Sequence, residues 1–177
     1  MPANFQQDFF SLFNLPRRFQ IDGIALEQAY RDLQAQVHPD KFAHLPEADR
    51  RLSMQWTTRV NEAFQTLRSP LNRARYLLTL HGVDTQEESN TSMPVEFLMQ
   101  QMEWREALEE ALQAKDMGAL ETLEQRMQHE TRNLQQQLAA DLDDTLDFAA
   151  ASGIVRKLKF LEKLAEEIHA AYDEIDN

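Results

Sequence analysis

Apolar side chains recur along the chain at spacings of three and four residues, the period of an amphipathic helix. The first half contains a short apolar turn over 9–13 and then three longer stripes: Leu26, Tyr30, Leu33, Val37; Leu52, Trp56, Val60, Ala63, Phe64, Leu67; and Ala74, Leu77, Leu78, Leu80. The second half contains three more: Phe97, Trp104, Leu108, Ala111, Leu112; Leu120, Leu123, Met127, Leu134, Leu138, Leu142; and Ile154, Leu158, Leu161, Ala165, Ile168, Tyr172, Ile175. No segment alternates apolar and polar residues for long enough to form a strand. The pattern predicts an all-α protein.

Residues that start and stop helices fall between these stripes. Asp22 is a suitable N-cap for the second helix. Pro39 requires that helix to end near His38, because proline disfavours the helical conformation of the residue before it. The third helix is expected to begin near Asp49, and Gly82 is a suitable C-cap for the fourth.

A polar segment, residues 81–93, separates the two groups of helices and has no helical period. We therefore expect a domain of short helices over 1–80, a connector over 81–93, and a domain of three long helices over 94–177. Apolar residues alternate at spacings of four and three in the last helix, which suits an antiparallel three-helix bundle. The same spacing could instead form a dimeric coiled coil.

Composition supports the helical prediction and excludes several functions. Leu and Ala number 23 and 20 against ten Val and Ile together, which favours helix over strand. The chain has no Cys, which excludes a disulfide framework, a thiol nucleophile and an iron–sulfur cluster held by its own thiolates. It also lacks a run of 18 apolar residues that could span a membrane. The N-terminus has no export signal, so we expect a cytoplasmic protein.

Charge is distributed unevenly over a net value of −12. Residues 1–80 carry ten Lys or Arg and eight Asp or Glu, a net +2, whereas residues 81–177 carry eight and twenty-two, a net −14. The acidic half is a poor candidate for binding nucleic acid or anionic lipid, since both repel it. The asymmetry suggests two modules with different partners, although acidic helix faces can also serve solubility alone.

The most distinctive polar group is His38-Pro39-Asp40, followed by Lys41, between the second and third helices. Proline stiffens the loop and lowers the entropy lost on binding. Asp40 offers a carboxylate that an Arg of a partner could grip with two hydrogen bonds. These residues indicate an exposed recognition loop. A metal or hydrolase site that uses His38, Asp40 and His44 is an alternative, but no established ligand spacing supports it.

The sequence around this loop resembles a J domain, the four-helix module of DnaJ-type co-chaperones. The resemblance covers roughly residues 5–80 and rests on five pieces in order: Phe9-Phe10-Ser-Leu-Phe-Asn-Leu-Pro, Ala29-Tyr30-Arg31-Asp32-Leu33, His38-Pro39-Asp40, Asn61-Glu-Ala-Phe-Gln-Thr-Leu-Arg-Ser-Pro and Asn72-Arg73-Ala74-Arg75-Tyr76. In that family the His-Pro-Asp loop stimulates ATP hydrolysis by a DnaK-class chaperone. The resemblance therefore assigns chaperone binding to His38, Pro39, Asp40, Lys41 and Arg31.

One feature departs from the usual J domain. The second helix of a J domain generally presents several Lys or Arg to the acidic chaperone surface. Here Arg31 is the main one, and Gln28, Gln34 and Gln36 occupy other exposed positions. Electrostatic steering is therefore expected to be weak or shifted to other basic residues of the domain.

A J domain followed by a short acidic helical domain is similar to the HscB family of iron–sulfur cluster assembly co-chaperones. Three further segments fit this family: Tyr76-Leu-Leu-Thr-Leu-His-Gly, Phe97-Leu-Met-Gln-Gln-Met-Glu-Trp-Arg-Glu and Val155-Arg-Lys-Leu-Lys-Phe-Leu-Glu-Lys-Leu. The resemblance implies two partners, an HscA-type ATP-driven chaperone and the IscU cluster scaffold. Eukaryotic relatives add a cysteine-bearing N-terminal segment, so its absence here suggests the bacterial type.

A partner surface is also expected from periodicity in the second half. At 100° per residue, Leu98, Met99 and Met102 point away from the stripe that contains Phe97, and Phe160 lies opposite the apolar seam of the last helix. Exposed apolar groups rimmed by charge indicate a binding surface, but the same residues could fill the core of the bundle. The family resemblance assigns scaffold binding to these segments: Leu98, Met99, Met102, Glu103, Glu106, Arg156 and Phe160.

Together these features predict a non-enzymatic adaptor that binds no cofactor and no metal. It would hold the scaffold with its acidic domain and stimulate the chaperone through its loop, and we expect it to be a monomer. An alternative is a J-domain adaptor that recruits a DnaK-class chaperone to a different client.

Overall fold

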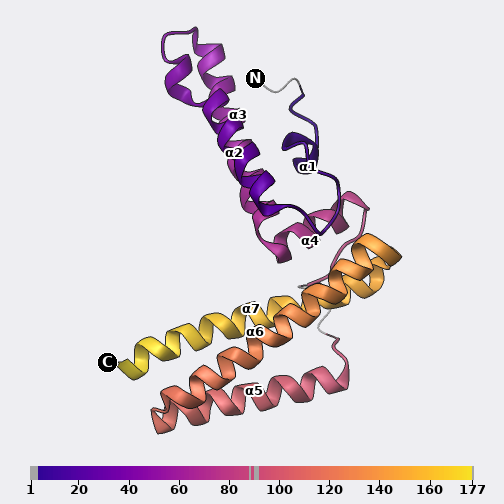
Figure 1. The fold of residues 1–177 in the computed structure, drawn as a ribbon, viewed down its shortest axis with the longest axis vertical. Coiled ribbons are helices and arrows are strands. Elements are labelled where there is room, and N and C mark those ends of the chain that lie inside the picture. The colour runs from indigo at the N-terminus through magenta and orange to yellow at the C-terminus, as the bar shows by residue number, and fades with distance from the viewer. Residues whose placement is uncertain (1–3, 88, 90–91, 177) are drawn as a thin grey trace. The chain divides into compact units, whose positions relative to one another are not determined.

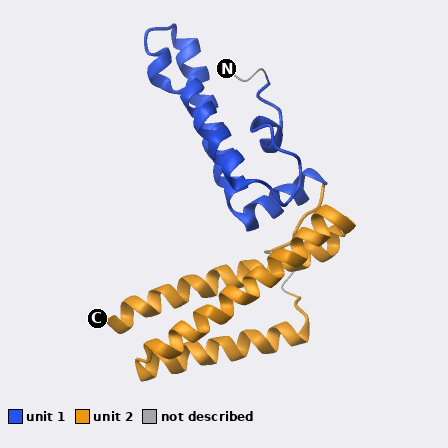
Figure 2. Ribbon diagram, viewed as in Figure 1, with its two compact units in different colours: residues 1–81 blue, residues 82–177 orange. Residues whose placement is uncertain are grey.

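The computed structural model describes residues 4–87, 89 and 92–176, and the chain divides into two compact units, residues 1–81 and 82–177 (Figure 2). Within the described residues every regular element is a helix, which confirms the all-α prediction (Figure 1). In that same part of the chain, none of the helices is long and apolar enough to cross a membrane.

The first unit is a long helical hairpin with shorter helices beside it. It contains α1 (Phe9–Leu12), α2 (Gly23–Val37), the 3₁₀ turn η1 (Pro39–Phe42), α3 (Glu47–Arg68) and α4 (Pro70–Leu80). Figure 1 shows α2 and α3 side by side, joined at one end by the loop that holds η1. The largest fully buried side chains of this unit are Phe10, Val37, Val60, Leu67 and Leu78.

Local chemistry explains where these helices begin and end. The Asp22 carboxylate accepts hydrogen bonds from the main-chain N–H groups of Ile24 and Ala25, which confirms the predicted N-cap of α2. That helix ends at Val37, as Pro39 requires. Gly82 follows α4 with a φ of +72°, the left-handed conformation that glycine adopts at low cost.

Two details of α3 differ from the sequence prediction. The helix begins at Glu47, two residues before Asp49. Pro46 can serve as its N-cap residue, because an N–H group at that position would have no hydrogen-bond partner within the helix. Leu52, placed on the apolar stripe, is 40% exposed, and the neighbouring Ser53 is fully buried instead. The buried stripe of α3 therefore contains a hydroxyl group that hydrophobic periodicity could not identify.

The N-terminal segment is tied to this unit by polar contacts. The Phe9 N–H donates to the Tyr76 hydroxyl at 3.0 Å, and the two rings stack with centroids 4.5 Å apart. The Arg59 guanidinium donates to the Gln7 carbonyl at 2.6 Å. Burial raises the pKa of Tyr76, since the phenolate would be poorly solvated there. These contacts hold α1 against α3 and α4.

The second unit is a three-helix bundle formed by α5 (Val95–Ala114), α6 (Met117–Ala139) and α7 (Phe148–Asp176). Consecutive helices run in opposite directions and lie side by side (Figure 1). The turn from α5 to α6 contains Lys115 in the left-handed conformation, and the Asp116 carboxylate caps α6 by accepting from the Ala119 N–H. The bundle core is built mainly from leucines, aromatic residues and an isoleucine: Phe97, Trp104, Leu120, Leu134, Leu138, Leu158, Leu161, Leu164 and Ile168.

A wide helical turn, η2 (Ala140–Thr145), joins α6 to α7 with hydrogen bonds of the π type. Leu142, which the apolar stripe placed at the end of the preceding helix, is buried in this turn. Leu146 then adopts the left-handed conformation, and Asp147 accepts a hydrogen bond from the Ala150 N–H at the start of α7. Burial, together with the nearby charge of Asp147, raises the pKa of Asp141.

The predicted apolar seam of α7 is correct at Ile168 as well as in the first part of the helix, but it fails at Ala165, Tyr172 and Ile175. Ile154, Leu158 and Leu161 are buried, but Leu164 and Ala171 then take the buried positions that the 4-3 spacing gave to Ala165 and Tyr172. Two successive spacings of three move the buried face around the helix, so a strict repeat misplaces later positions. The helix begins at Phe148, and Gly153 lies inside it.

Candidate functional site

The His-Pro-Asp segment occupies the tip of the α2–α3 hairpin. The chain leaves the helical conformation at His38, whose φ and ψ are −56° and 129°, and Pro39 opens the 3₁₀ turn η1. The side chain of His38 is 52% exposed and that of Asp40 is 90% exposed. Lys41 and His44 are exposed as well. The structure thus brings the predicted recognition residues together at one exposed tip.

The His38 ring makes contacts inside the loop. Its Nδ1 atom accepts a hydrogen bond from the Asp40 N–H at 3.3 Å and lies 3.5 Å from the Asp40 carboxylate. Because Nδ1 is an acceptor here, the proton of the neutral ring is on Nε2. The ring therefore caps η1 with one nitrogen and can donate a hydrogen bond outward with the other.

Contacts along the hairpin hold the loop in a defined place. The Tyr30 hydroxyl donates to the Asn61 side chain at 2.9 Å, and the Tyr30 and Phe64 rings stack with centroids 4.0 Å apart. At the tip, the Val37 carbonyl accepts hydrogen bonds from the hydroxyls of Ser53 and Thr57 on α3. Polar groups therefore fix the contact between α2 and α3 at the tip and at the middle of α2.

Arg31, the one basic residue predicted to face a partner from α2, is exposed and pairs with Glu27 one turn earlier at 3.2 Å. Its charge is therefore partly balanced by a neighbour on the same helix. An exposed pair of this kind is weak, so the guanidinium can exchange Glu27 for an acidic group of a partner at small cost.

The alternative metal site finds no support in the geometry of the loop. Among the described residues, no three His, Cys, Asp or Glu side chains are arranged so that they could hold a metal ion. His38 and Asp40 contact each other, and His44 does not join them as a third ligand.

The first half of α5 presents an apolar surface on the side opposite the bundle core. Leu98, Met99 and Met102 are 42%, 58% and 72% exposed, as the helical period predicted. Val95 is 67% exposed and extends the same surface by one turn, although the sequence analysis did not include it. We call these four residues the α5 patch. Glu103 and Glu106 are exposed beside it, at the positions the period gave them.

Phe160 is half-buried, so the expected exposure is wrong and the alternative, packing within the bundle, is correct for this residue. Its ring is half-buried, 5.9 Å from Phe97 and 6.3 Å from Trp104 between centroids, with the Arg105 guanidinium 5.4 Å away over the ring. The helical period places the ring correctly, on the side of α7 that faces away from the main seam, but α5 covers that side. Phe160 therefore packs into the aromatic cluster beneath the first half of α5.

Arg156, another predicted scaffold-binding residue, makes a contact within its own unit. Its guanidinium donates to the Thr85 carbonyl at 3.0 Å, and its Nε atom is buried. The Thr85 hydroxyl in turn donates to Glu87 at 2.7 Å. Arg156 thus ties the start of the second unit to α7.

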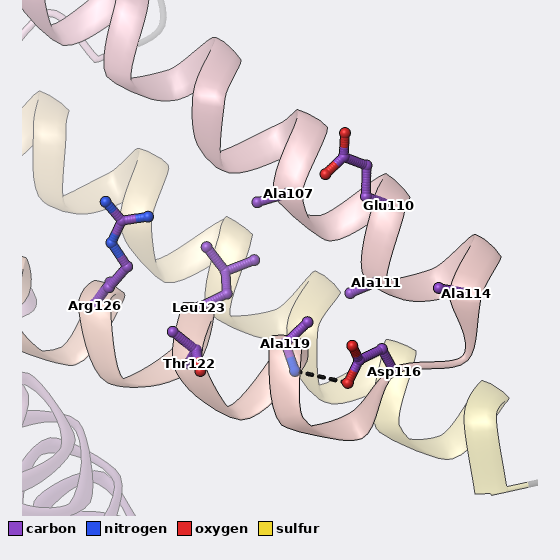
Figure 3. A pocket seen from close by; sticks show the side chains of 9 residues that line it. All are labelled: Ala107, Glu110, Ala111, Ala114, Asp116, Ala119, Thr122, Leu123 and Arg126. Atoms are coloured by element: carbon purple, nitrogen blue, oxygen red, sulfur yellow. Dashed lines mark hydrogen bonds between the residues drawn. The ribbon is translucent and has the colours of Figure 1, made fainter.

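A shallow groove runs between α5 and α6 at the far end of α5 from the patch (Figure 3). Its walls are mostly small side chains, with charged groups at the edge: Ala107, Glu110, Ala111, Ala114, Asp116, Ala119, Thr122, Leu123 and Arg126. In Figure 3 the Asp116 carboxylate points toward the N-terminus of α6, where it accepts from the Ala119 N–H at 3.0 Å. The acidic group therefore serves as a helix cap.

A helical hairpin that presents His-Pro-Asp at its tip, followed by a helical bundle, defines a J-domain type of co-chaperone. Comparison with known proteins narrows this class. A family model described as "HSCB C-terminal oligomerisation domain" matches residues 93–169. A relative from Aromatoleum aromaticum, named "Co-chaperone protein HscB homolog", is 54% identical over 176 residues, which is 99% of both chains.

Solved structures give the same result. The chaperone HscB from Vibrio cholerae is 37% identical, with a TM-score of 0.84 over 96% of this chain and 99% of that one. The human co-chaperone protein HscB is 30% identical, with a TM-score of 0.89 over 96% of this chain and 84% of that one. The chain belongs to the HscB family of co-chaperones.

Proposed function

We propose that this protein is a non-enzymatic adaptor of iron–sulfur cluster biogenesis, which delivers the IscU scaffold to an HscA-type chaperone of the DnaK class. The first unit docks on the ATP-bound chaperone, and the second unit holds the scaffold. The close relatives are named co-chaperones, which agrees with a role other than catalysis. We expect this to take place in the cytoplasm.

The exposed tip of the α2–α3 hairpin is the observation that carries the proposal. Asp40 extends into solvent with its side chain 90% exposed, and His38 can donate outward from Nε2. A carboxylate so displayed can accept two parallel hydrogen bonds from an Arg of the chaperone. Docking that favours the ATP-hydrolysing state of the chaperone then accelerates hydrolysis.

The α5 patch supports the scaffold-binding half of the proposal. Exposed Leu and Met side chains lose water on binding, and Met adapts its shape to a partner. Glu103 and Glu106 beside the patch can pair with basic groups of the scaffold. Phe160 supports this surface from beneath through its contact with Phe97. Arg156, whose guanidinium donates to the Thr85 carbonyl, remains a proposed scaffold-binding residue.

Holding both partners on one chain raises the effective concentration of the scaffold at the chaperone. The matched family model is described as an oligomerisation domain. We propose that one copy of the chain is sufficient for the adaptor function, and sedimentation equilibrium at working concentrations tests whether the chain is a monomer.

The loop assignment is tested by His38→Gln, with His44→Gln as a matched control on the same loop. We expect His38→Gln to remove at least nine-tenths of the stimulation of the chaperone's ATPase while scaffold affinity stays unchanged. His44→Gln should stimulate normally. Full stimulation by His38→Gln would contradict the assignment of the loop.

A further inference from the structure

The last main-chain carbonyl of α2, that of Val37, receives no hydrogen bond from the residues that follow it. The last four carbonyls of a helix have no partner within it, and they are commonly closed by N–H groups of the following residues. Here the N–H groups that could reach the Val37 carbonyl, those of Asp40 and Lys41, donate instead to His38 Nδ1 and to the His38 carbonyl, and Pro39 has no N–H to donate. Val37 itself is fully buried, so water cannot serve its carbonyl. A donor must come from elsewhere in the fold.

Two hydroxyls on α3 meet this need. Ser53 Oγ donates to the Val37 carbonyl at 2.6 Å, across 16 residues of sequence. Thr57 lies one turn further along α3, with its Oγ1 3.2 Å from the same carbonyl and 3.0 Å from the Ser53 carbonyl. The Thr57 hydroxyl has a single proton to share between the carbonyls of Val37 and Ser53, so Ser53 is the stronger donor to the Val37 carbonyl.

This carbonyl belongs to the peptide group that joins Val37 to His38. A peptide group is planar, so fixing the direction of its carbonyl also fixes the direction in which the chain enters the loop. The next residues are His38, whose ψ of 129° turns the chain out of the helix, and the 3₁₀ turn that displays Asp40. A tie at the carbonyl of Val37 therefore sets the orientation of the whole tip.

We propose that Ser53, assisted by Thr57, is a positioning residue for the His38-Pro39-Asp40 loop. The effect on chaperone docking rests on the function proposed above, whereas the effect on the loop belongs to the free protein. A loop that is held in its docking geometry loses less conformational entropy when it binds. Without the tie, a higher concentration of the protein is needed for half-maximal stimulation, but the maximal rate is preserved.

The test combines a loop measurement with an activity measurement on the full chain. Ser53→Ala should shift the carbonyl ¹³C resonance of Val37 and lower the backbone order parameters of residues 38–40. It should also raise the half-maximal concentration for ATPase stimulation about fivefold, the expected scale for one buried hydrogen bond, with an unchanged maximum. Thr57→Val should have the same effects at about twofold, whereas Thr57→Ser, which keeps the hydroxyl, should restore wild-type values.

Two controls separate positioning from a general loss of stability. Thr58→Val removes a hydroxyl that donates to the Met54 carbonyl on the exposed side of α3, and it should leave the loop unchanged. Ala63→Gly weakens the same helix at a buried site away from the tip. If Ala63→Gly loosens the loop as much as Ser53→Ala does, or if Ser53→Ala leaves the Val37 resonance and the order parameters unchanged, the proposal is wrong.

The loop measurement needs no chaperone, so the two hypotheses can fail separately. A wild-type protein that does not stimulate the chaperone contradicts the proposed function, and the NMR data still decide whether Ser53 orders the loop. A loosened loop with an unchanged half-maximal concentration would show that Ser53 orders the loop without serving docking, and would overturn the positioning role.

Discussion

At the scale of single residues, three arginines of this protein donate hydrogen bonds to main-chain carbonyls and so act as internal ties. Arg59 donates to the Gln7 carbonyl at 2.6 Å, Arg73 to the Leu67 carbonyl at 2.7 Å and Arg156 to the Thr85 carbonyl at 3.0 Å. Hydrogen bonds from a charged donor to a buried carbonyl are stronger than neutral ones. Two of these arginines belong to the first unit, so its basic residues are not all available to attract an acidic chaperone.

Asp8 offers a test of such a tie by pH. Burial alone would raise the pKa of Asp8, but hydrogen bonds from Arg17, at 2.7 Å, and from Ser11 outweigh it and lower the pKa below its usual value. A lowered pKa in the folded state stabilises the protein at pH values above 3.8, and this stabilisation is lost as pH falls through the folded-state pKa.

We therefore expect Asp8→Asn to lower the stability of the first unit at pH 7 by up to about 1 kcal/mol. Asn can still cap α1, so the loss of stability measures the contribution of the negative charge of Asp8. The difference from wild type should shrink toward zero as pH falls below 3.8. Urea unfolding, followed through NMR signals of the first unit, measures this. A difference that does not change with pH would contradict the assigned cause, and Arg17→Gln should reproduce the effect.

At the scale of elements, α5 has two functions on two faces. One face buries Phe97 and Trp104 in the bundle, and the other exposes the α5 patch. Leu98 and Met102 are two exposed members of this patch and do not fill the core. Replacing them should therefore affect binding and leave the fold intact.

The double variant Leu98→Ala, Met102→Ala should weaken binding of the scaffold at least tenfold in isothermal titration calorimetry, because central apolar contacts dominate interface energies. Its melting temperature should stay close to that of wild type, since exposed positions contribute little to stability. Leu146→Ala is the matched control, an exposed leucine of the same unit, 57% exposed, at the turn before α7. Equal affinity of the double variant and the control would contradict the patch.

Phe160 should behave differently because of its packing. We expect Phe160→Ala to lower the free energy of unfolding of the second unit by about 2 kcal/mol, somewhat less than for a fully buried ring. Scaffold affinity should fall as well, since the ring supports Phe97 beneath the patch. Chemical unfolding followed by the fluorescence of Trp104, in a Trp56→Phe background, reports on this unit. An unchanged stability would contradict the packing described here.

Much of the helical framework could be predicted from the sequence, because helix ends depend on local chemistry. Asp22 and Pro39 define α2, and the exposure of Met102 follows from the helical period. The burial of Phe160 could not be predicted, since the period of one helix does not reveal which neighbour covers its other side. The buried hydroxyl of Ser53 was missed for a related reason: its partner, Val37, lies on another helix.

At the scale of the whole molecule, the charge difference between the halves matches the division into two compact units. The first 80 residues are nearly neutral, and the remainder carries a net −14. An acidic unit repels other acidic surfaces and attracts basic ones, which favours selective encounter with a partner. Two units of different charge suit an adaptor that binds two unlike partners at once.

The adaptor claim is tested most directly by single-turnover ATP hydrolysis. The cognate HscA-type chaperone, preloaded with ATP, is mixed with increasing amounts of this protein in the presence and absence of the IscU scaffold. The account predicts acceleration by the protein alone, a further increase when the scaffold is present, and loss of only that increase in the Leu98→Ala, Met102→Ala variant. Acceleration that the scaffold does not increase further would indicate a different client, and no acceleration by folded protein would contradict the central claim.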